Sequence, residues 1–259
     1  MTERHLEGRH AIVTGGSRGI GLAVARALGA RGASLTLMGR SMEHLKDAAA
    51  GLAALDVEIL LTECDVGDEA SVGAAFALSR RQFPTPFILV NNAGQGDVAP
   101  FAELPRATWD RMLAVNLTGT WLATREVYPA MVAAGRGRIV NVVSVAGVRG
   151  FAGGSAYAAA KHGVVGLTRS LALEAARTGV TVNAVCPGYT DTDMAARAAA
   201  NVSKHRGIAL ADAEKVIART LPLGRLIRPD EVADTVAWLC SDGASAVSGQ
   251  TIVIAGGDA

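Results

Sequence analysis

The sequence predicts an α/β protein in which a doubly wound, seven-stranded parallel sheet carries helices on both faces. Three observations lead to this prediction. Short apolar runs alternate with longer amphipathic runs along the 259 residues. Several apolar runs are continuous in Val, Ile and Leu, which is typical of strands buried on both faces. The resulting β-α-β alternation favours parallel neighbours joined by helical crossovers.

Each element follows from its local pattern. Strands are predicted in the short aliphatic and β-branched runs at residues 10–13, 34–38, 57–63, 87–91, 138–144, 181–186 and 251–254. Helical spacing of apolar residues predicts helices at 21–33, 41–54, 69–83, 107–134, 155–178 and 230–241. Asp68 and Asp230 are the expected N-caps of two of these helices, because an aspartate there accepts hydrogen bonds from free backbone N–H groups.

Residues 189–223 interrupt the alternation after the sixth strand. The segment is long, polar and rich in alanine. An excursion of this size in a compact domain is usually functional, so we expect a substrate lid with short helices at 191–200 and 211–220. Because no linker-like stretch or internal repeat occurs, residues 1–259 are predicted to form a single domain.

Composition argues against several classes of function. The net charge of +1 gives no electrostatic reason to expect binding to nucleic acid or to a membrane surface. No run approaches the ~18 apolar residues of a membrane helix, and the amino terminus lacks the apolar core of a signal peptide. The three cysteines are expected to be buried free thiols, and the five histidines show no metal-ligand spacing. We therefore expect a soluble cytoplasmic protein without a metal.

A glycine-rich turn lies between the first predicted strand and the first predicted helix. Gly15 permits a positive φ, Gly19 allows close approach to a pyrophosphate, and Gly21 opens a helix whose free N–H groups attract an anion. Ser17, Arg18 and Ile20 complete this predicted dinucleotide site. Residues 15–19 also match G-x-S-x-G, the nucleophile turn of serine hydrolases. Hydrolysis at Ser17 is retained as a remote alternative, since the turn follows the first strand and no upstream loop could form an oxyanion hole.

The charge after the second strand bears on the choice of cofactor. Many dinucleotide sites place an acid ~20 residues beyond the glycines for the ribose 2′-hydroxyl, whereas an arginine suits a 2′-phosphate. This chain has Arg40 there and no acid, and Arg18 lies in the glycine turn. The two cations favour NADP(H) over NAD(H). The alternative is that both are ordinary arginines facing solvent.

Tyr157 and Lys161 are four residues apart early in a predicted helix, so their side chains share one face. An ammonium beside a phenol is expected to lower its pKa from the ordinary ~10 and to suit proton exchange with an alcohol oxygen. Ser144 ends the fifth predicted strand and can reach the same crevice. Ser144 would orient a carbonyl, Tyr157 would supply the proton, and a nicotinamide would supply the hydride.

In these motifs the sequence resembles the short-chain dehydrogenase/reductase family over nearly the whole chain. The motifs are Thr14-Gly15-x-x-x-Gly19-x-Gly21, Asp65-Val66, Asn91-Asn-Ala-Gly94, Asn116, Ser144, Tyr157-x-x-x-Lys161, Pro187-Gly188 and Thr192. The resemblance implies a single NAD(P)-binding domain of Rossmann type and a homotetramer. The long helices at 107–134 and 155–178 have more apolar positions than one sheet face covers, which also favours self-association.

The resemblance further implies roles for individual residues. Tyr157 would be the general acid/base, Lys161 would lower its pKa and bind the nicotinamide ribose, and Ser144 would orient the carbonyl. Asn116 would hold a water that links Lys161 to solvent. Cofactor contacts are implied for Asp65 and Val66 at the adenine, for Asn92, Ala93 and Gly94 on the adenosine side, and for Pro187, Gly188, Thr190 and Thr192 at the carboxamide. Two structural alternatives stay open, a helix kink at Asn116 and an Asx turn at Asp65.

The substrate is the least constrained expectation. The pocket is expected to be lined by Gln95, Val145, Phe151, Tyr189 and Met194, which are mostly apolar. The chain is most similar to 3-oxoacyl reductases, so we expect a 3-oxoacyl thioester or a β-keto ester. Few cations precede the fifth strand, which favours a CoA or free ester over a carrier protein. Alternatives are a small or cyclic ketone or alcohol, including NAD-dependent turnover, and a catalytically silent binding protein. Ala255 replaces an aspartate common in relatives and is expected to affect subunit contacts.

Overall fold

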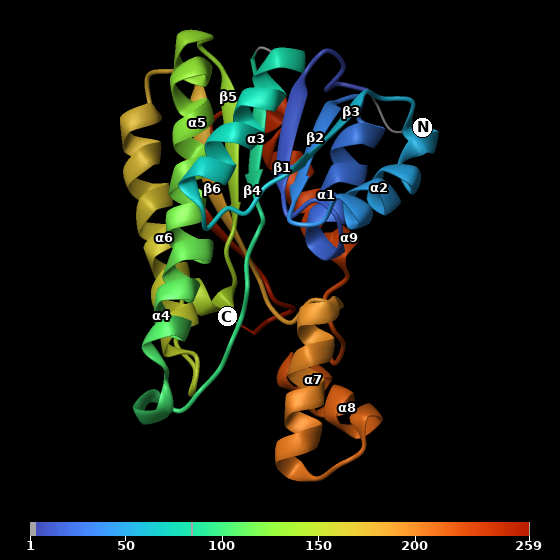
Figure 1. Cartoon of the computed structure of the whole chain (residues 1–259), viewed down its shortest axis with the longest axis vertical. Coiled ribbons are helices and arrows are strands. Elements are labelled where there is room, and N and C mark those ends of the chain that lie inside the picture. Colours follow the sequence, from blue (N-terminus) through green and yellow to red (C-terminus); the bar gives the residue numbers. More distant parts are fainter. Residues whose placement is uncertain (1–3, 84, 259) are drawn as a thin grey trace.

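The computed structural model describes residues 4–83 and 85–258 and contains one seven-stranded sheet (Figure 1). The strands follow the order β3-β2-β1-β4-β5-β6-β7, and every neighbouring pair is parallel. Their bounds are β1 His10–Thr14, β2 Ser34–Gly39, β3 Ile59–Glu63, β4 Ile88–Asn91, β5 Gly137–Val142, β6 Val180–Pro187 and β7 Thr251–Ile254. The predicted fold class is confirmed.

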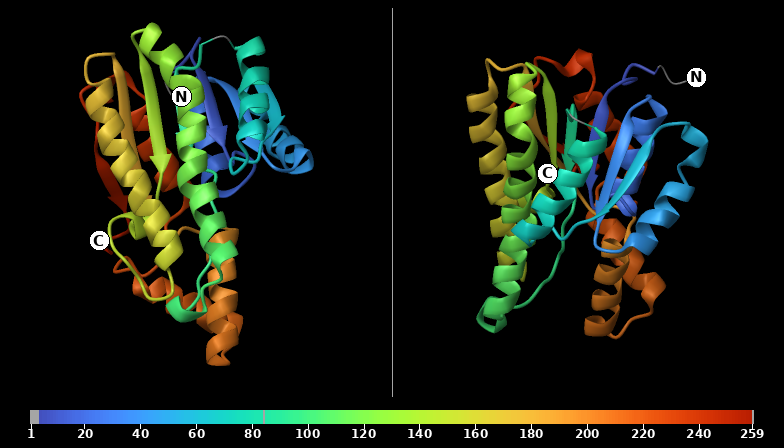
Figure 2. Two further views of the ribbon diagram at one scale, coloured as in Figure 1. Left: turned by 60° about the vertical axis from the view of Figure 1, so that its left-hand side comes forward. Right: turned by 45° about the horizontal axis from the view of Figure 1, so that its top comes forward.

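Helices cover both faces of the sheet (Figure 2). One face carries α1 Gly19–Ala30, α2 Met42–Ala50 and α9 Pro229–Leu239, and the other carries α3 Glu69–Gln82, α5 Gly119–Ala133 and α6 Ser155–Ala175. Successive strand residues supply the two cores, because side chains alternate across a strand. On β1, Val13 packs with Val24 of α1, whereas Ile12 packs with Phe76 of α3.

The predicted helix at 107–134 is wrong as a single α-helix. The structure has α4 Arg106–Leu113, a π-helical turn at Ala114–Thr118, and then α5. Within that turn the Asn116 Nδ2 donates to the carbonyl oxygen of Met112 at 3.0 Å. A side chain therefore bonds the carbonyl four residues back, which a regular α-helix would pair with a backbone N–H. Such π turns often occur at functional sites.

The two predicted N-caps have different outcomes. Asp68 caps α3, where its carboxylate accepts from the backbone N–H of Ala70 at 2.9 Å. Asp230 is not an N-cap, because it lies inside the first turn of α9. The cap position belongs to Arg228, and Pro229 begins the helix with a backbone angle suited to the first helical position.

The remaining helix bounds shift by a few residues. The first helix begins at Gly19 rather than residue 21, and the helix predicted at 41–54 ends at Ala50, before a short 3-10 turn at Ala53–Leu55. The segment after β6 forms α7 Asp193–Arg206, which is longer than predicted, and α8 Leu210–Thr220. These two helices share a small core of Ala199, Ala213 and Ile217 and extend beyond the end of the sheet (Figure 1).

Because all strands are parallel, the turns after β1, β4, β5 and β6 meet at one edge of the sheet. The chain order reverses between β1 and β4, and ligands of open α/β sheets bind beyond the carboxyl ends at such a point. No helix within residues 4–83 and 85–258 combines the length and hydropathy that a membrane crossing would need.

Candidate active site

The glycine turn after β1 has no room for a side chain at Gly15 or Gly21. Gly15 has a φ of +64°, a left-handed conformation that glycine adopts without strain. A Cβ on Gly21 would overlap the carbonyl oxygen of Gly15 and would lie 2.5 Å from Asn92 Nδ2. The backbone therefore turns back on itself tightly enough that α1 can begin at Gly19, directly behind the turn.

Asn92 ties this turn to the end of β4. Its Nδ2 donates to the carbonyl oxygens of Thr14 and Gly15, each at 3.0 Å. Thr14 Oγ1 accepts in return from the backbone N–H groups of Asn92 at 3.0 Å and Ala93 at 3.1 Å. The Asn92 amide thus braces the two turns that flank the reversal point. No role was predicted for Thr14, although it stands in the glycine motif. Its hydroxyl helps to hold the two turns together.

The start of α1 suits a phosphate. Arg18 occupies the N-cap position in an extended conformation, and no side chain caps the helix. The first backbone N–H groups of a helix have no partner within it, so an anion can accept from them. An uncapped helix behind a glycine-rich turn is the arrangement that a dinucleotide pyrophosphate requires. On this observation the residues present fit such a cofactor.

The two predicted cations lie in different surroundings. Arg40 follows β2 and is exposed, and no ion pair in the described part of the chain involves it. Ser17 lies in the glycine turn after β1, close to the end of β2. Its Oγ is 3.7 Å from the position of a Cβ on Gly39. Arg18 forms an ion pair with Asp193 at the start of α7, at 2.9 Å between Nη1 and Oδ2. No pattern in the sequence predicted this pairing.

Asp65 follows β3 and forms the Asx turn that was the structural alternative. Its Oδ1 accepts from the backbone N–H of Gly67 at 2.9 Å, and its side chain remains exposed. Val66 is buried beneath the start of α5, where a Cβ on Gly119 would lie 2.7 Å from its carbonyl oxygen. Both residues lie at the carboxyl end of β3, on the predicted adenine side.

Ser144 and Tyr157 lie close together, and the Ser144 side chain acts to lower the pKa of Tyr157. Ser144 follows β5 in an extended conformation, and its Oγ accepts from the backbone N–H of Ala146 at 3.1 Å. The Ser144 hydroxyl keeps its own hydrogen and can donate it to a neighbouring oxygen. Tyr157 lies in the first turn of α6, half-buried, at the same edge of the sheet.

Lys161 lies one turn further along α6 and is 5% exposed. Its Nζ donates to the carbonyl oxygen of Val142 at 3.0 Å and lies 5.7 Å from the centre of the Tyr157 ring. Burial lowers the pKa of Lys161 to about 8. Burial also raises the pKa of Tyr157 to about 12, and the Ser144 side chain opposes that rise. The expectation of a lowered Tyr157 pKa is wrong for this structure, because loss of hydration outweighs the lowering effect of Ser144.

Asn116 completes this group from the π turn. Its Oδ1 accepts from the Gln95 backbone N–H at 3.2 Å, and its Nδ2 donates to the Gln95 carbonyl oxygen at 3.0 Å. A Cβ on Gly94 would lie 2.9 Å from Asn116 Oδ1 and 3.6 Å from Lys161 Nζ. The structure therefore brings Asn116 beside Lys161 and uses its amide to clamp the segment after β4.

The predicted nicotinamide segment leads from β6 into α7. Gly188 packs against Ala255, and a Cβ added to it would lie 3.1 Å from the Ala255 Cβ. Thr190 is buried, and its Oγ1 donates to the carbonyl oxygen of Gly188 at 3.1 Å. Thr192 Oγ1 donates to the Thr190 carbonyl oxygen at 3.2 Å. These bonds fix the chain from Pro187, the last residue of β6, to the start of α7.

The predicted substrate residues border the same edge of the sheet. Met194 Sδ lies 3.5 Å from the position of a Cβ on Gly96, so α7 approaches the loop that holds Gln95. Phe151 packs against Gly154 at the start of α6, and Val145 is half-buried after Ser144. Phe151, Tyr189 and Met194 remain 46%, 42% and 38% exposed. The site is open and largely apolar on this side.

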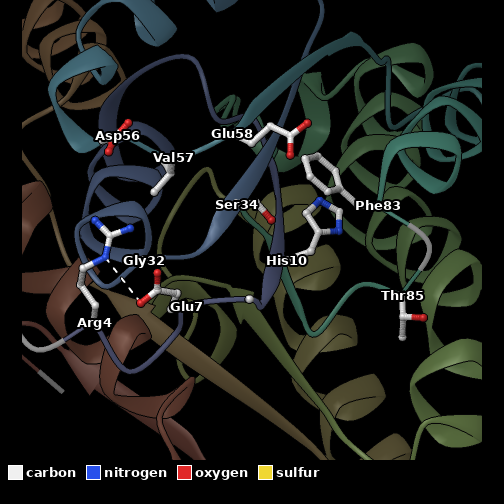
Figure 3. A pocket seen from close by; sticks show the side chains of 11 residues that line it. Arg4, Glu7, His10, Gly32, Ser34, Asp56, Val57, Glu58, Phe83 and Thr85 are labelled. Carbon is white, nitrogen blue, oxygen red and sulfur yellow. Dashed lines mark ion pairs between the residues drawn. The ribbon is translucent and has the colours of Figure 1, made fainter.

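A separate cavity of about 410 Å³ lies at the opposite ends of the strands (Figure 3). It is lined by His10, which begins β1, together with Ser34, which begins β2, and Glu58 and Phe83 nearby. No residue predicted to bind cofactor or substrate lines this cavity. We therefore place the chemistry at the carboxyl ends of the strands.

Known proteins share this arrangement. A family model described as short chain dehydrogenase matches residues 9–203. A crystal structure of an actinorhodin polyketide ketoreductase variant with NADPH superposes with a TM-score of 0.94 and 38% identity, covering 100% of this chain and 99% of that one. Cis-4-hydroxycyclohexanecarboxylate dehydrogenase of Sinomonas cyclohexanicum is 42% identical over 96% of both chains. D-beta-hydroxybutyrate dehydrogenase of Cupriavidus necator is 36% identical over 94% of this chain and 95% of its own.

The family-model match includes the glycine turn, Ser144, Tyr157 and Lys161. The relatives also extend the likeness through α8, α9 and β7, beyond the end of that match. The sheet and the turns that position the site therefore have the fold of the matched proteins. The chain belongs to the short-chain dehydrogenase/reductase family and is one of its oxidoreductases.

Proposed function

We propose that this protein is an NADP(H)-dependent reductase of ketones, with a 3-oxoacyl thioester or β-keto ester as its preferred substrate. The observation that carries the proposal is the grouping of Ser144 beside Tyr157, with Lys161 one helical turn away and its Nζ 5.7 Å from the centre of the Tyr157 ring. These three groups lie at the edge of the sheet where the glycine turn can hold a dinucleotide. A proton donor and a cofactor cradle thus share one site.

The side chains would act in sequence on the substrate oxygen. Ser144 donates a hydrogen bond to the carbonyl oxygen and orients it, and Tyr157 transfers its phenolic proton to that oxygen as charge develops. The raised pKa keeps Tyr157 protonated at neutral pH, which is the form that reduction consumes. When bound, the nicotinamide supplies the hydride. Lys161 then restores the phenolic proton from solvent through a water held near Asn116.

The residues around the edge would hold the cofactor. Gly15, Ser17, Gly19, Ile20 and Gly21 surround the pyrophosphate, and Arg18 and Arg40 meet the 2′-phosphate. Asp65, Val66, Asn92, Ala93 and Gly94 form the adenosine side, and Lys161, Pro187, Gly188, Thr190 and Thr192 form the nicotinamide side. The absence of an acid after β2 supports NADP(H), as does the likeness to a ketoreductase solved with NADPH.

A small or cyclic ketone is the second candidate substrate. The open, apolar border formed by Phe151, Tyr189 and Met194 accommodates a compact ring as well as an acyl chain. The similarity to a dehydrogenase of a hydroxycyclohexane acid favours this candidate. We further propose that residues 189–223 close over the substrate, so that the exposed part of this border becomes covered.

The proposed function is tested with a panel of 3-oxoacyl-CoA esters, β-keto esters and cyclic ketones, assayed with NADPH and NADH in parallel. We expect the highest kcat/KM for a 3-oxoacyl substrate with NADPH. Faster turnover of cyclic ketones would favour the second candidate, and no oxidation of either cofactor across the panel would contradict both. An Arg40→Asp variant should raise the KM for NADPH at least about tenfold, since a carboxylate would oppose the 2′-phosphate.

Self-association is also proposed. Trp121 on α5 is 44% exposed and Leu173 on α6 is 80% exposed, although both are large and apolar. Pairing of these helices with a second copy would cover them and suits a homotetramer, which sedimentation would test. The free, buried Cys64, Cys186 and Cys240 support a reducing compartment such as the cytoplasm.

A further inference from the structure

Arg18 is already engaged by a carboxylate of its own chain. Its Nη1 lies 2.9 Å from Asp193 Oδ2. Arg18 occupies the N-cap position of α1 at the glycine turn, and Asp193 is the first residue of α7. The ion pair therefore links the proposed cofactor turn to the proposed lid.

A second contact brings the same two segments together. The Cγ2 of Thr192 lies 3.1 Å from the position of a Cβ on Gly19. Thr192 does not cap α7 with its side chain, and Asp193 is the acid in the first turn of that helix. The carboxylate therefore stands next to the turn, opposite a guanidinium that the 2′-phosphate would also use.

We propose that Asp193 is a residue that sets cofactor selectivity, because its carboxylate competes with the 2′-phosphate of NADP(H) for the Arg18 guanidinium. This inference rests on the proposed function, in which Arg18 meets that phosphate. NAD(H) carries a hydroxyl in place of the 2′-phosphate and does not need the Arg18 guanidinium for binding. Asp193 therefore weakens the binding of NADP(H) but not that of NAD(H). It reduces the difference between the affinities for the two cofactors.

The exposure of the pair limits the size of the effect. The Arg18 and Asp193 side chains are 59% and 61% exposed. Exposed ion pairs are weak, so removing the competitor should change affinity by no more than about fivefold. A phosphate dianion can displace such a carboxylate, which then remains close enough to repel it. Both effects act against NADP(H) and in the same direction.

The first experiment measures the dissociation constants of NADPH and NADH by fluorescence titration without any carbonyl substrate. Asp193→Asn should tighten NADPH binding about three- to fivefold and leave NADH binding unchanged. Asp212→Asn is the matched control, because Asp212 is also the acid in the first turn of a helix in this segment and pairs with Lys215 at 3.0 Å. It should leave both constants unchanged.

The second experiment asks whether the effect passes through Arg18. Arg18→Gln should weaken NADPH binding, and adding Asp193→Asn to it should produce no further change, because no guanidinium remains to be released. Equal tightening of NADPH and NADH by Asp193→Asn would overturn the proposal, as would an unchanged or weaker affinity for NADPH. Melting temperatures of the cofactor-free variants confirm that each is folded.

The same measurements separate this proposal from the proposed function. Suppose that Arg18→Gln and Arg40→Asp both leave NADPH binding unchanged. The NADP(H) preference is then wrong, and the role of Asp193 falls with it. If these two variants lose NADPH affinity while Asp193→Asn leaves it unchanged, only the role of Asp193 is overturned.

Discussion

The ammonium of Lys161 lies 5.7 Å from the centre of the Tyr157 ring, and burial shifts the pKa of each group in the direction that favours its neutral form. The pKa of the lysine falls to about 8, whereas that of the tyrosine rises to about 12. Tyr157 is consequently a proton donor at neutral pH, and Lys161 can exchange a proton near that pH. This pairing fits carbonyl reduction, in which the substrate oxygen must gain a proton.

The first prediction concerns the phenolic proton. Tyr157→Phe removes the proton donor and should lower kcat by about 10²- to 10⁴-fold, the range typical of positioned acids. Steady-state assays with the best ketone of the panel measure this loss. Tyr128→Phe is the control, because Tyr128 is a half-buried tyrosine that packs against the core between the sheet and helices α3, α5 and α6. Comparable activity of Tyr157→Phe and wild type would show that the proton comes from another group.

The second prediction concerns the space behind the glycine turn. Gly21→Ala places a methyl group against the Gly15 carbonyl oxygen and the Asn92 amide, so the turn must open. We expect the dissociation constant of NADPH to rise more than about tenfold, in line with the loss of one charge-assisted hydrogen bond. Fluorescence titration measures it.

Gly73→Ala is the matched control for that substitution. Gly73 lies within α3, and a Cβ there would meet no atom within 4 Å. Alanine is the better helix former by about 1 kcal/mol, so this variant should be at least as stable as wild type and should bind NADPH equally. Equal NADPH affinity of the Gly21 and Gly73 variants would contradict the placement of the pyrophosphate.

The fold was predictable because its signals are local. The buried strand Ile88–Asn91 appears in the sequence as a continuous apolar run, and the spacing of Tyr157 and Lys161 on one helix places them together. Three features depend on tertiary contacts and were not predictable. Arg18 finds Asp193 only once α7 has packed on the glycine turn. The π turn requires the amide of Asn116 to reach both Met112 and Gln95. The pKa of Tyr157 is set mainly by burial, which the neighbouring residues in the sequence do not reveal.

The third prediction links the protonation of Lys161 to stability. The pKa of Lys161 is about 8 in the folded chain and 10.5 ordinarily. Between these values the unfolded chain binds more protons, so stability rises as the pH increases from 8 to about 10.5, by up to about 3 kcal/mol. Lys161→Met removes this rise of stability with pH. It also removes the free-energy cost of burying the ammonium. Denaturant unfolding at pH 7.5 and pH 10 measures the difference.

The Lys161→Met variant should therefore gain stability relative to wild type at pH 7.5 and lose most of that advantage at pH 10, while kcat falls. Lys46→Met supplies the comparison, since Lys46 is exposed on α2 and its removal should not change the pH dependence. If the free-energy difference between Lys161→Met and wild type is the same at both pH values, the burial of the ammonium does not govern its titration.

The last prediction concerns His10, whose ring is 5% exposed and stacks on Phe83 with 4.2 Å between ring centres. Its Nε2 is hydrogen-bonded to Thr36 Oγ1 at 2.8 Å, and burial lowers its pKa from 6.5 to about 4. Below pH 6.5 the unfolded chain takes up a proton that the folded chain does not. The free energy of unfolding should therefore decrease as the pH falls from about 6.5 toward 4, by about 3 kcal/mol from this residue.

Substitution of His10 separates its share from that of the other titrating groups. His10→Gln keeps a polar group near Thr36 without a titration in this range, so its stability should change less between pH 7 and pH 4.5 than that of wild type. Urea unfolding at the two pH values gives the comparison. His44→Gln should behave as wild type, because His44 is exposed on α2. An undiminished loss of stability in His10→Gln would mean that carboxylates, and not the imidazole at the start of β1, cause the acid sensitivity.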